Sequence, residues 1–162
     1  MKTLFTPLFA LLLLAGFLTG CDKADMKIKQ LYHGDGTWTI KSLHYEDYDS
    51  TGYYVVSDST ITEPGEFMFF KTTTLDGLFE YHFAVIMLKL PNGASHEYPC
   101  GVYFDGSRAH VEANVYPDYV PPEYLAVWSI TKSGRRNQEW TKFTMRADGS
   151  LARKVTMVLK FK

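Results

Sequence analysis

The feature that most constrains the fold of this chain is a period-two alternation of apolar and polar residues, repeated in short runs after residue 34. Residues 78–90 form a long run of this kind, and residues 108–116 alternate well. Such alternation is typical of strands, because successive side chains point to opposite faces of a sheet. Asp-Gly pairs, which are strong turn signals, separate several runs. No helical period is seen after residue 34, so we expect an all-β fold.

We expect about eight or nine strands joined mostly by short turns. Pro64-Gly65 is interpreted as a turn and the polar stretch 44–52 as a loop. In the 78–90 run the odd positions form a continuous apolar face, which we expect to point inward. The expected strands cover residues 36–43, 53–57, 67–70, 78–90, 98–104, 108–116, 124–131, 139–146 and 151–161. Regularly spaced short strands favour a barrel or a sandwich.

Length, charge and composition agree with one β domain. A chain of 162 residues is long enough for a single domain. Its 11 Tyr, 11 Phe and 3 Trp favour strands, because aromatic side chains suit half-buried pleated surfaces. The formal net charge of -1 gives no general attraction for nucleic acid, and basic residues do not cluster among aromatics. We therefore expect no nucleic-acid partner.

The first 21 residues have the layout of a secretory signal. Lys2 supplies a positive start, and residues 4–18 are apolar and uncharged. The end of the segment, Leu18-Thr19-Gly20-Cys21, resembles the lipobox of bacterial lipoproteins. The resemblance implies a signal peptide over residues 1–20 and a Cys21 that carries diacylglycerol, with acyl chains such as palmitate. An ordinary signal peptide or an uncleaved anchor is the alternative.

Residues 22–34 have mixed charge and little apolar periodicity, so we interpret residues 21–34 as the lipidated Cys21 and a tether, and residues 35–162 as the domain. Asp22 resembles an inner-membrane retention signal of enterobacterial lipoproteins and a surface-export signal of other Gram-negative lineages. The expected location is the cell envelope, with the outer membrane preferred. A lipidated Cys21 would leave Cys100 without an intramolecular disulfide partner, so the core alone must hold the domain.

The Gly36-x-Trp38 motif at the start of the first expected strand resembles the signature of lipocalins and related calycins. The resemblance implies a single antiparallel meander barrel of about eight strands, with a β-sandwich as the alternative. Lipocalins often carry an arginine on the last strand that packs over the tryptophan, and Arg153 is the candidate here. A second lipocalin motif is not clearly present.

Few residues point to catalysis. His82 with Glu80, and His110 with Glu112, are pairs two residues apart on strand faces expected to point outward. We interpret them as solvated polar patches rather than as a metal site. Cys100 is expected to be buried and inert, because a nucleophile needs a lowered pKa and a nearby base. We therefore expect no enzyme activity, no cofactor and no metal.

Two functions remain open, besides the disfavoured enzyme. The first is binding of a small apolar ligand or a lipid inside the barrel. The second is a filled barrel that binds an envelope protein or glycan through loop tyrosines, since tyrosine suits recognition. Both include attachment to a membrane through the N-terminal lipid. The candidate ligand-binding residues are Trp38, Phe83, Val85, Trp128 and Phe161, and the candidate loop contacts are Tyr45, Tyr48, Tyr119 and Tyr124.

Overall fold

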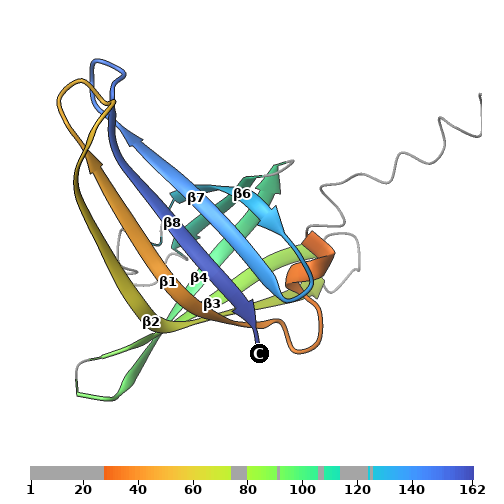
Figure 1. The fold of residues 1–162 in the computed structure, drawn as a ribbon. Coiled ribbons are helices and arrows are strands. Elements are labelled where there is room, and N and C mark those ends of the chain that lie inside the picture. The colour runs from red at the N-terminus through yellow and green to blue at the C-terminus, as the bar shows by residue number, and fades with distance from the viewer. Residues whose placement is uncertain (1–27, 74–79, 91, 106–107, 114–123, 125) are drawn as a thin grey trace, which may run out of the picture.

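The structure of the protein is a computed structural model that describes residues 28–162 except 74–79, 91, 106–107, 114–123 and 125. A helical turn at residues 28–31 precedes eight strands (Figure 1). The strands are β1 (Thr37–Tyr48), β2 (Val55–Thr73), β3 (Glu80–Lys89), β4 (Ser95–Asp105), β5 (Arg108–Ala113), β6 (Ala126–Ser133), β7 (Asn137–Met145) and β8 (Leu151–Phe161). Within the described residues, no helix is long and apolar enough to cross a membrane.

The eight strands form a closed antiparallel barrel in which each strand pairs with its sequence neighbours. The barrel closes where β1 pairs with β8, from Trp38 opposite Phe161 to Asp47 opposite Arg153. This pairing confirms the predicted single meander barrel and excludes the β-sandwich alternative. A closed barrel also removes the free sheet edges that invite aggregation.

The predicted turn at Pro64-Gly65 is wrong, because both residues lie inside the 19-residue strand β2. The pairing of β1 with β2 shifts here: Ile40 faces Gly65 while Ser42 faces Thr62, so β2 bulges. Glu63 has a φ of 46° at this bulge. A bulge tolerates a proline, which has no N–H for the ladder. The stretch 44–48, expected to belong to a loop, likewise continues β1.

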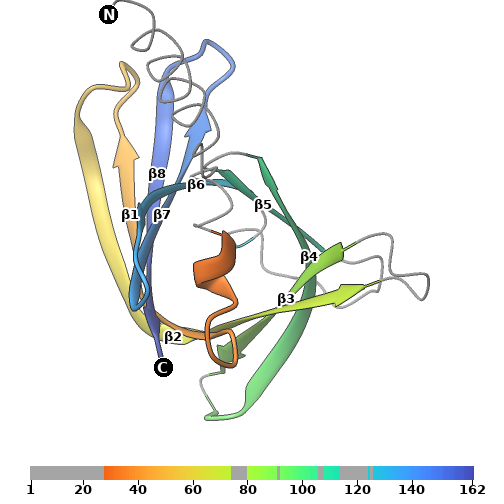
Figure 2. The ribbon, with the colours of Figure 1, turned by 90° about the vertical axis from the view of Figure 1, so that its right-hand side faces the viewer.

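The alternation of strand direction gives the barrel two distinct ends. We define the closed end as the end where β1 starts and β8 finishes, together with the β2–β3, β4–β5 and β6–β7 connections. The open end holds the β1–β2, β3–β4, β5–β6 and β7–β8 connections. Figure 2 looks into the barrel, with the 28–31 turn in the middle of the ring of strands.

The 28–31 turn is a cap that belongs to the folded body, and it lies at the closed end. Leu31 is fully buried in the core, and its carbonyl oxygen accepts a 2.9 Å hydrogen bond from Trp38 Nε1. Ser133 donates a 2.7 Å hydrogen bond to Gln30 Oε1 across the barrel end. Residues 28–34 were predicted to belong to the tether. The packed structure instead begins by residue 28, because Leu31 has an apolar site to fill.

Strand β3 faces the opposite way from the prediction. Ala84 and Ile86 are the fully buried residues of this strand, so Phe83 and Val85 lie on its outer face. Phe83 stacks there on Phe70, with ring centroids 6.0 Å apart. The two predicted ligand-binding residues of β3 therefore do not point into the barrel. Both faces of β3 are largely apolar. The prediction placed the even-numbered residues outward because the first two of them, Glu80 and His82, are polar.

Candidate functional site at the open end of the barrel

The closed half of the barrel interior is filled with aromatic side chains. Phe67 and Phe69 stack with centroids 4.7 Å apart, and each lies within about 6 Å of the Trp140 ring. Trp38 packs edge-on against Phe161 at 5.5 Å. Trp38, Phe67 and Trp140 are fully buried. Trp38 and Phe161, predicted to line a ligand cavity, are thus neighbours at the closed end, where they fill the core.

The open half shows a different pattern of burial. Four residues of the inward-facing registers pack against the core but remain partly exposed, although their neighbours deeper in the barrel are buried. They come from four different strands and lie toward the open end of each, so we call them the rim residues. These rim residues are Tyr45 on β1, Leu88 on β3, Tyr98 on β4 and Ala126 on β6.

Trp128 lies one step deeper than the rim residue Ala126 on β6 and is fully buried. Its Nε1 donates a 3.1 Å hydrogen bond to the Tyr124 carbonyl oxygen. The Lys142 ammonium lies 5.1 Å from the Trp128 ring centroid, a cation–π arrangement. Lys142 pairs with Val155, which is buried, so the lysine occupies the inward register of β7. The open end therefore combines apolar rim residues with the Lys142 cation, and it includes the predicted residue Trp128.

The three predicted loop tyrosines that the structure describes do not lie on loop surfaces as expected. Tyr45 and Tyr48 lie in strand β1 rather than in a loop. Tyr124 is buried at 2% exposure, which contradicts its predicted role as an exposed contact. Tyr119 lies outside the described residues.

Sequence reasoning missed two tyrosines at the tip of the β1–β2 hairpin, which it had placed in a strand. Tyr53 and Tyr54 are 83% and 71% exposed. Asp49 organises their turn, because its carboxylate accepts hydrogen bonds from the Thr51 hydroxyl and from both tyrosine amides. The bond from Thr51 is the main cause that lowers the pKa of Asp49. The Asp49-Ser-Thr-Gly52 pattern is the sequence signal that predicts this turn.

Arg153 was predicted to pack over Trp38, and this prediction is wrong. Arg153 faces Asp47 near the open end, whereas Phe161 is the β8 residue opposite Trp38. Its guanidinium donates to both carboxylate oxygens of Asp47, with Nη2–Oδ2 at 3.1 Å, and lies over the Tyr45 ring. The hydrogen bond from Arg153 lowers the pKa of Asp47. Arg153 thus links Asp47 to the ring of the rim residue Tyr45.

Cys100 is fully buried on β4, and burial raises its pKa to about 12. A thiol with that pKa is neutral at physiological pH and is a poor nucleophile. Its sulfur donates to the Tyr98 carbonyl oxygen at 3.4 Å. These contacts give Cys100 a structural role, as predicted.

The two histidines of the predicted pairs contact different neighbours. His82 is not on an outward face: its Nδ1 lies 2.6 Å from the Tyr32 hydroxyl, and its ring contacts Phe104 at the closed end. His110 stacks on Tyr103 at 4.3 Å, and Tyr103 is half exposed. Across the described part of the chain, no three His, Cys, Asp or Glu residues lie close enough together to hold a metal ion.

No protein-family model matches the chain, and no curated protein sequence matches it either. Among solved structures, a lipocalin-like protein from Bacteroides uniformis ATCC 8492 is similar, with 10% sequence identity and a TM-score of 0.44. The match covers 77% of this chain and 96% of that chain. The strand pairing of this chain itself closes the eight-stranded barrel.

Proposed function

We propose that this protein is a lipid-anchored lipoprotein of the cell envelope whose barrel binds a small apolar ligand at its open end. The observation that carries the proposal is the gradient of burial along the barrel interior. Most inward-facing residues of the closed half are fully buried, with Phe104 and Phe161 as partly buried exceptions, whereas the rim residues Tyr45, Leu88, Tyr98 and Ala126 are all only partly buried. A ligand seated on the rim would remove this apolar surface from water, which contributes roughly 25 cal/mol per Å².

The anchor is supported by the position of the lipobox-like segment relative to the fold. Cys21 precedes the cap by seven residues, and the cap lies at the closed end. A chain attached there leaves the open end directed away from the membrane and accessible to a ligand. The two or three acyl chains of a bacterial lipoprotein give stable attachment, whereas one chain is marginal.

The anchor is tested by the mass of the intact protein made from the full chain in a Gram-negative host. We expect the membrane fraction to contain a chain that begins at Cys21 and carries a diacylglyceryl group. A Cys21→Ser variant should lose that mass and leave the membrane fraction. An unmodified chain, or equal membrane attachment of the variant, would disprove the anchor.

Ligand binding is tested with a chain that begins at residue 22, which keeps all eight strands and the cap. The probe is N-phenyl-1-naphthylamine, a neutral apolar fluorophore. We expect Ala126→Leu to weaken its binding at least fivefold, because about three added carbon atoms would crowd the rim. Val127→Leu is the matched control, since Val127 is the next residue on β6 and is 48% exposed on the outside. Native and denaturing masses of the unmutated chain would also reveal a captured ligand.

Equal effects of the two leucine substitutions would place the probe elsewhere and reject the rim as its site. The hairpin tip supports a second function in that case. Tyr53, Tyr54 and Val56 are all at least 65% exposed, and rigid exposed aromatic side chains suit contact with an envelope protein or glycan. Unchanged probe binding in Ala126→Leu, together with a bare native mass, would favour this second function.

A further inference from the structure

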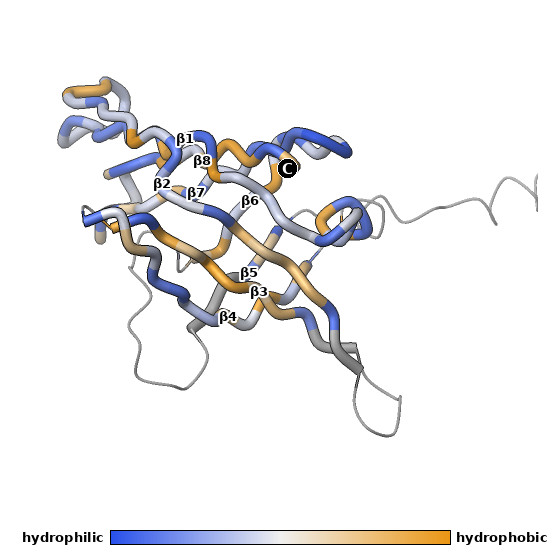
Figure 3. Tube along the Cα trace, turned by 90° about the horizontal axis from the view of Figure 1, so that it is seen from below, coloured by the Kyte–Doolittle hydropathy of each residue, from blue (hydrophilic) through white to orange (hydrophobic). Residues whose placement is uncertain are grey.

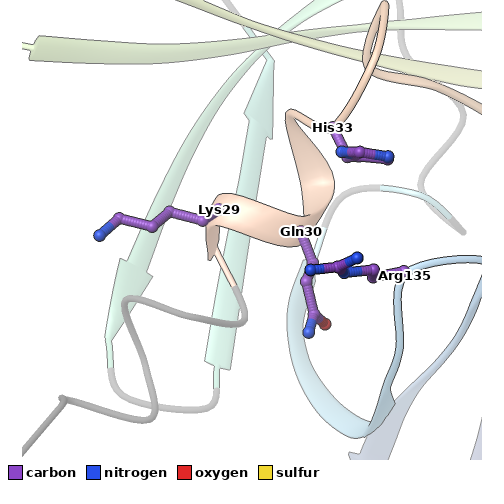
Figure 4. A pocket seen from close by; sticks show the side chains of 4 residues that line it. All are labelled: Lys29, Gln30, His33 and Arg135. Carbon is purple, nitrogen blue, oxygen red and sulfur yellow. The ribbon is translucent and has the colours of Figure 1, made fainter.

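The outer surface of the closed end carries a basic groove that the ligand proposal does not use. Two adjoining hollows share His33 and Arg135. One has a volume of about 310 Å³, and Figure 4 shows Arg135 reaching over Gln30 beneath His33, while Lys29 points away. The other has a volume of about 450 Å³ and is lined by His33, Arg135, Arg136, Lys160, Phe161 and Lys162. We call the second hollow the basic groove.

The positive charge of the basic groove is largely uncompensated. Lys162 pairs with Glu66 at 2.8 Å. Within the described ranges, no ion pair joins Arg135, Arg136 or Lys160 to an acidic side chain. The chain as a whole has a formal charge of only -1, so this concentration is local. Neighbouring like charges repel one another, and an anion in the groove would relieve that repulsion.

Three parts of the chain build the basic groove. The cap region contributes His33, the β6–β7 turn contributes Arg135 and Arg136, and the end of β8 contributes Lys160 and Lys162. Figure 3 shows, from below, the hydrophilic β6–β7 turn beside the C-terminus. The Phe161 amide donates a 2.9 Å hydrogen bond to the Arg136 carbonyl oxygen, which ties the turn to the strand end. The cations are therefore held on a fixed framework.

The basic groove also lies on the side of the molecule where the tether enters. Residue 28 follows Cys21 by seven positions, and a fully extended chain of seven residue steps spans at most about 25 Å. A lipid on Cys21 would therefore keep the groove close to the membrane surface. The phosphate groups of phospholipids are the concentrated anions at that surface.

We propose that the basic groove binds the phosphate groups of anionic phospholipids in the membrane that carries the anchor. Guanidinium groups match phosphate because they donate two parallel hydrogen bonds, and two adjacent arginines supply this geometry twice. Binding would fix the closed end against the membrane and hold the open end outward. The choice of a membrane as the source of phosphate rests on the proposed lipid anchor, whereas the groove itself does not.

The test uses the chain that begins at residue 22, so that binding to a membrane cannot come from the lipid. Its affinity is measured by sedimentation with vesicles of phosphatidylcholine and phosphatidylglycerol at a 7:3 ratio. We expect binding to these vesicles and none to phosphatidylcholine alone. Arg135→Gln together with Arg136→Gln should weaken binding roughly 30-fold, since each basic residue near an anionic surface contributes about a factor of five.

The matched control is Lys89→Gln together with Lys154→Gln, which removes two positive charges near the open end. We expect this control to change the affinity by less than about twofold, because charges beyond a Debye length of about 10 Å are screened. An equal loss of vesicle affinity in both double variants would show that only the net charge of the protein matters, and it would overturn the proposal. Displacement of the bound chain by inorganic phosphate at constant ionic strength would also overturn it, in favour of a site for free phosphate. Failure of the proposed anchor would instead appear in the intact-protein mass, as a chain without a diacylglyceryl group on Cys21.

Discussion

Replacing Gly36 by alanine is expected to lower the free energy of unfolding by about 3 kcal/mol or more. Gly36 has a φ of 72°, which costs a residue with a Cβ about 1–2 kcal/mol. A Cβ added at Gly36 would also lie 2.1 Å from the Phe69 carbonyl oxygen, well inside contact distance. The clash involves backbone, which cannot rotate away. The Gly36 carbonyl oxygen accepts a hydrogen bond from the Phe69 amide at 2.9 Å, so the substitution would push two strands apart.

Gly149→Ala is the matched control for this prediction. Gly149 has a φ of 82°, and nothing lies within 4 Å of an added Cβ. We expect the free energy of unfolding of this variant to fall by about 1 kcal/mol, the cost of a positive φ alone. Urea unfolding followed by far-ultraviolet circular dichroism measures both values. Equal losses would show that close approach to Phe69 is not why a glycine occupies position 36.

The fold could be predicted from the sequence because alternation is a local signal. The predicted strand at residues 108–116 placed Ala109 inward, and the structure buries it opposite Trp128 on β6. Such strands have one polar face and one apolar face, so the sequence alone indicates which face points into the barrel. Strand β3 has apolar side chains on both faces, so alternation alone does not fix which face is buried. The burial of Ile86 rather than Val85 is decided by the pairing of β3 with β2, where Ile86 faces Phe67.

The errors at Pro64 and Arg153 share a physical cause, which is long-range register. A proline-glycine pair predicts a turn when only its neighbours are considered, yet pairing with β1 converts it into a bulge. Arg153 lies in an apolar register that could reach Trp38 only if β8 were paired eight residues further along. The observed register places Asp47 opposite Arg153 instead.

The candidate site was less predictable than the fold. Trp128 could be recognised as an inward residue, because it alternates within β6. The rim is defined by how deeply each inward residue lies along the barrel axis, and this depth depends on strand tilt and on the bulges. The segment 22–34 has only four large apolar side chains, Met26, Ile28, Leu31 and Tyr32, among charged and polar residues, which is too short a pattern for periodicity to predict the cap.

Trp38→Ala is expected to lower the free energy of unfolding by about 4 kcal/mol, the range for a fully buried tryptophan. The loss has two causes. The substitution leaves a cavity beside Phe161, which packs against Trp38 at 5.5 Å. It also removes the 2.9 Å hydrogen bond from Nε1 to the Leu31 carbonyl oxygen, which holds the cap over the barrel end. A buried carbonyl without a partner costs about 1–3 kcal/mol.

Trp38→Phe separates the two causes, because phenylalanine keeps an aromatic ring but cannot donate to Leu31. We expect it to lose about 2 kcal/mol in the same urea experiment, roughly half of the alanine effect. Binding of N-phenyl-1-naphthylamine should not change in Trp38→Phe, since Trp38 lies at the closed end and the probe at the rim. Weakened probe binding in a stably folded Trp38→Phe protein would mean that the two ends are coupled. It would contradict the division of the barrel into a filled closed half and a ligand-binding open half.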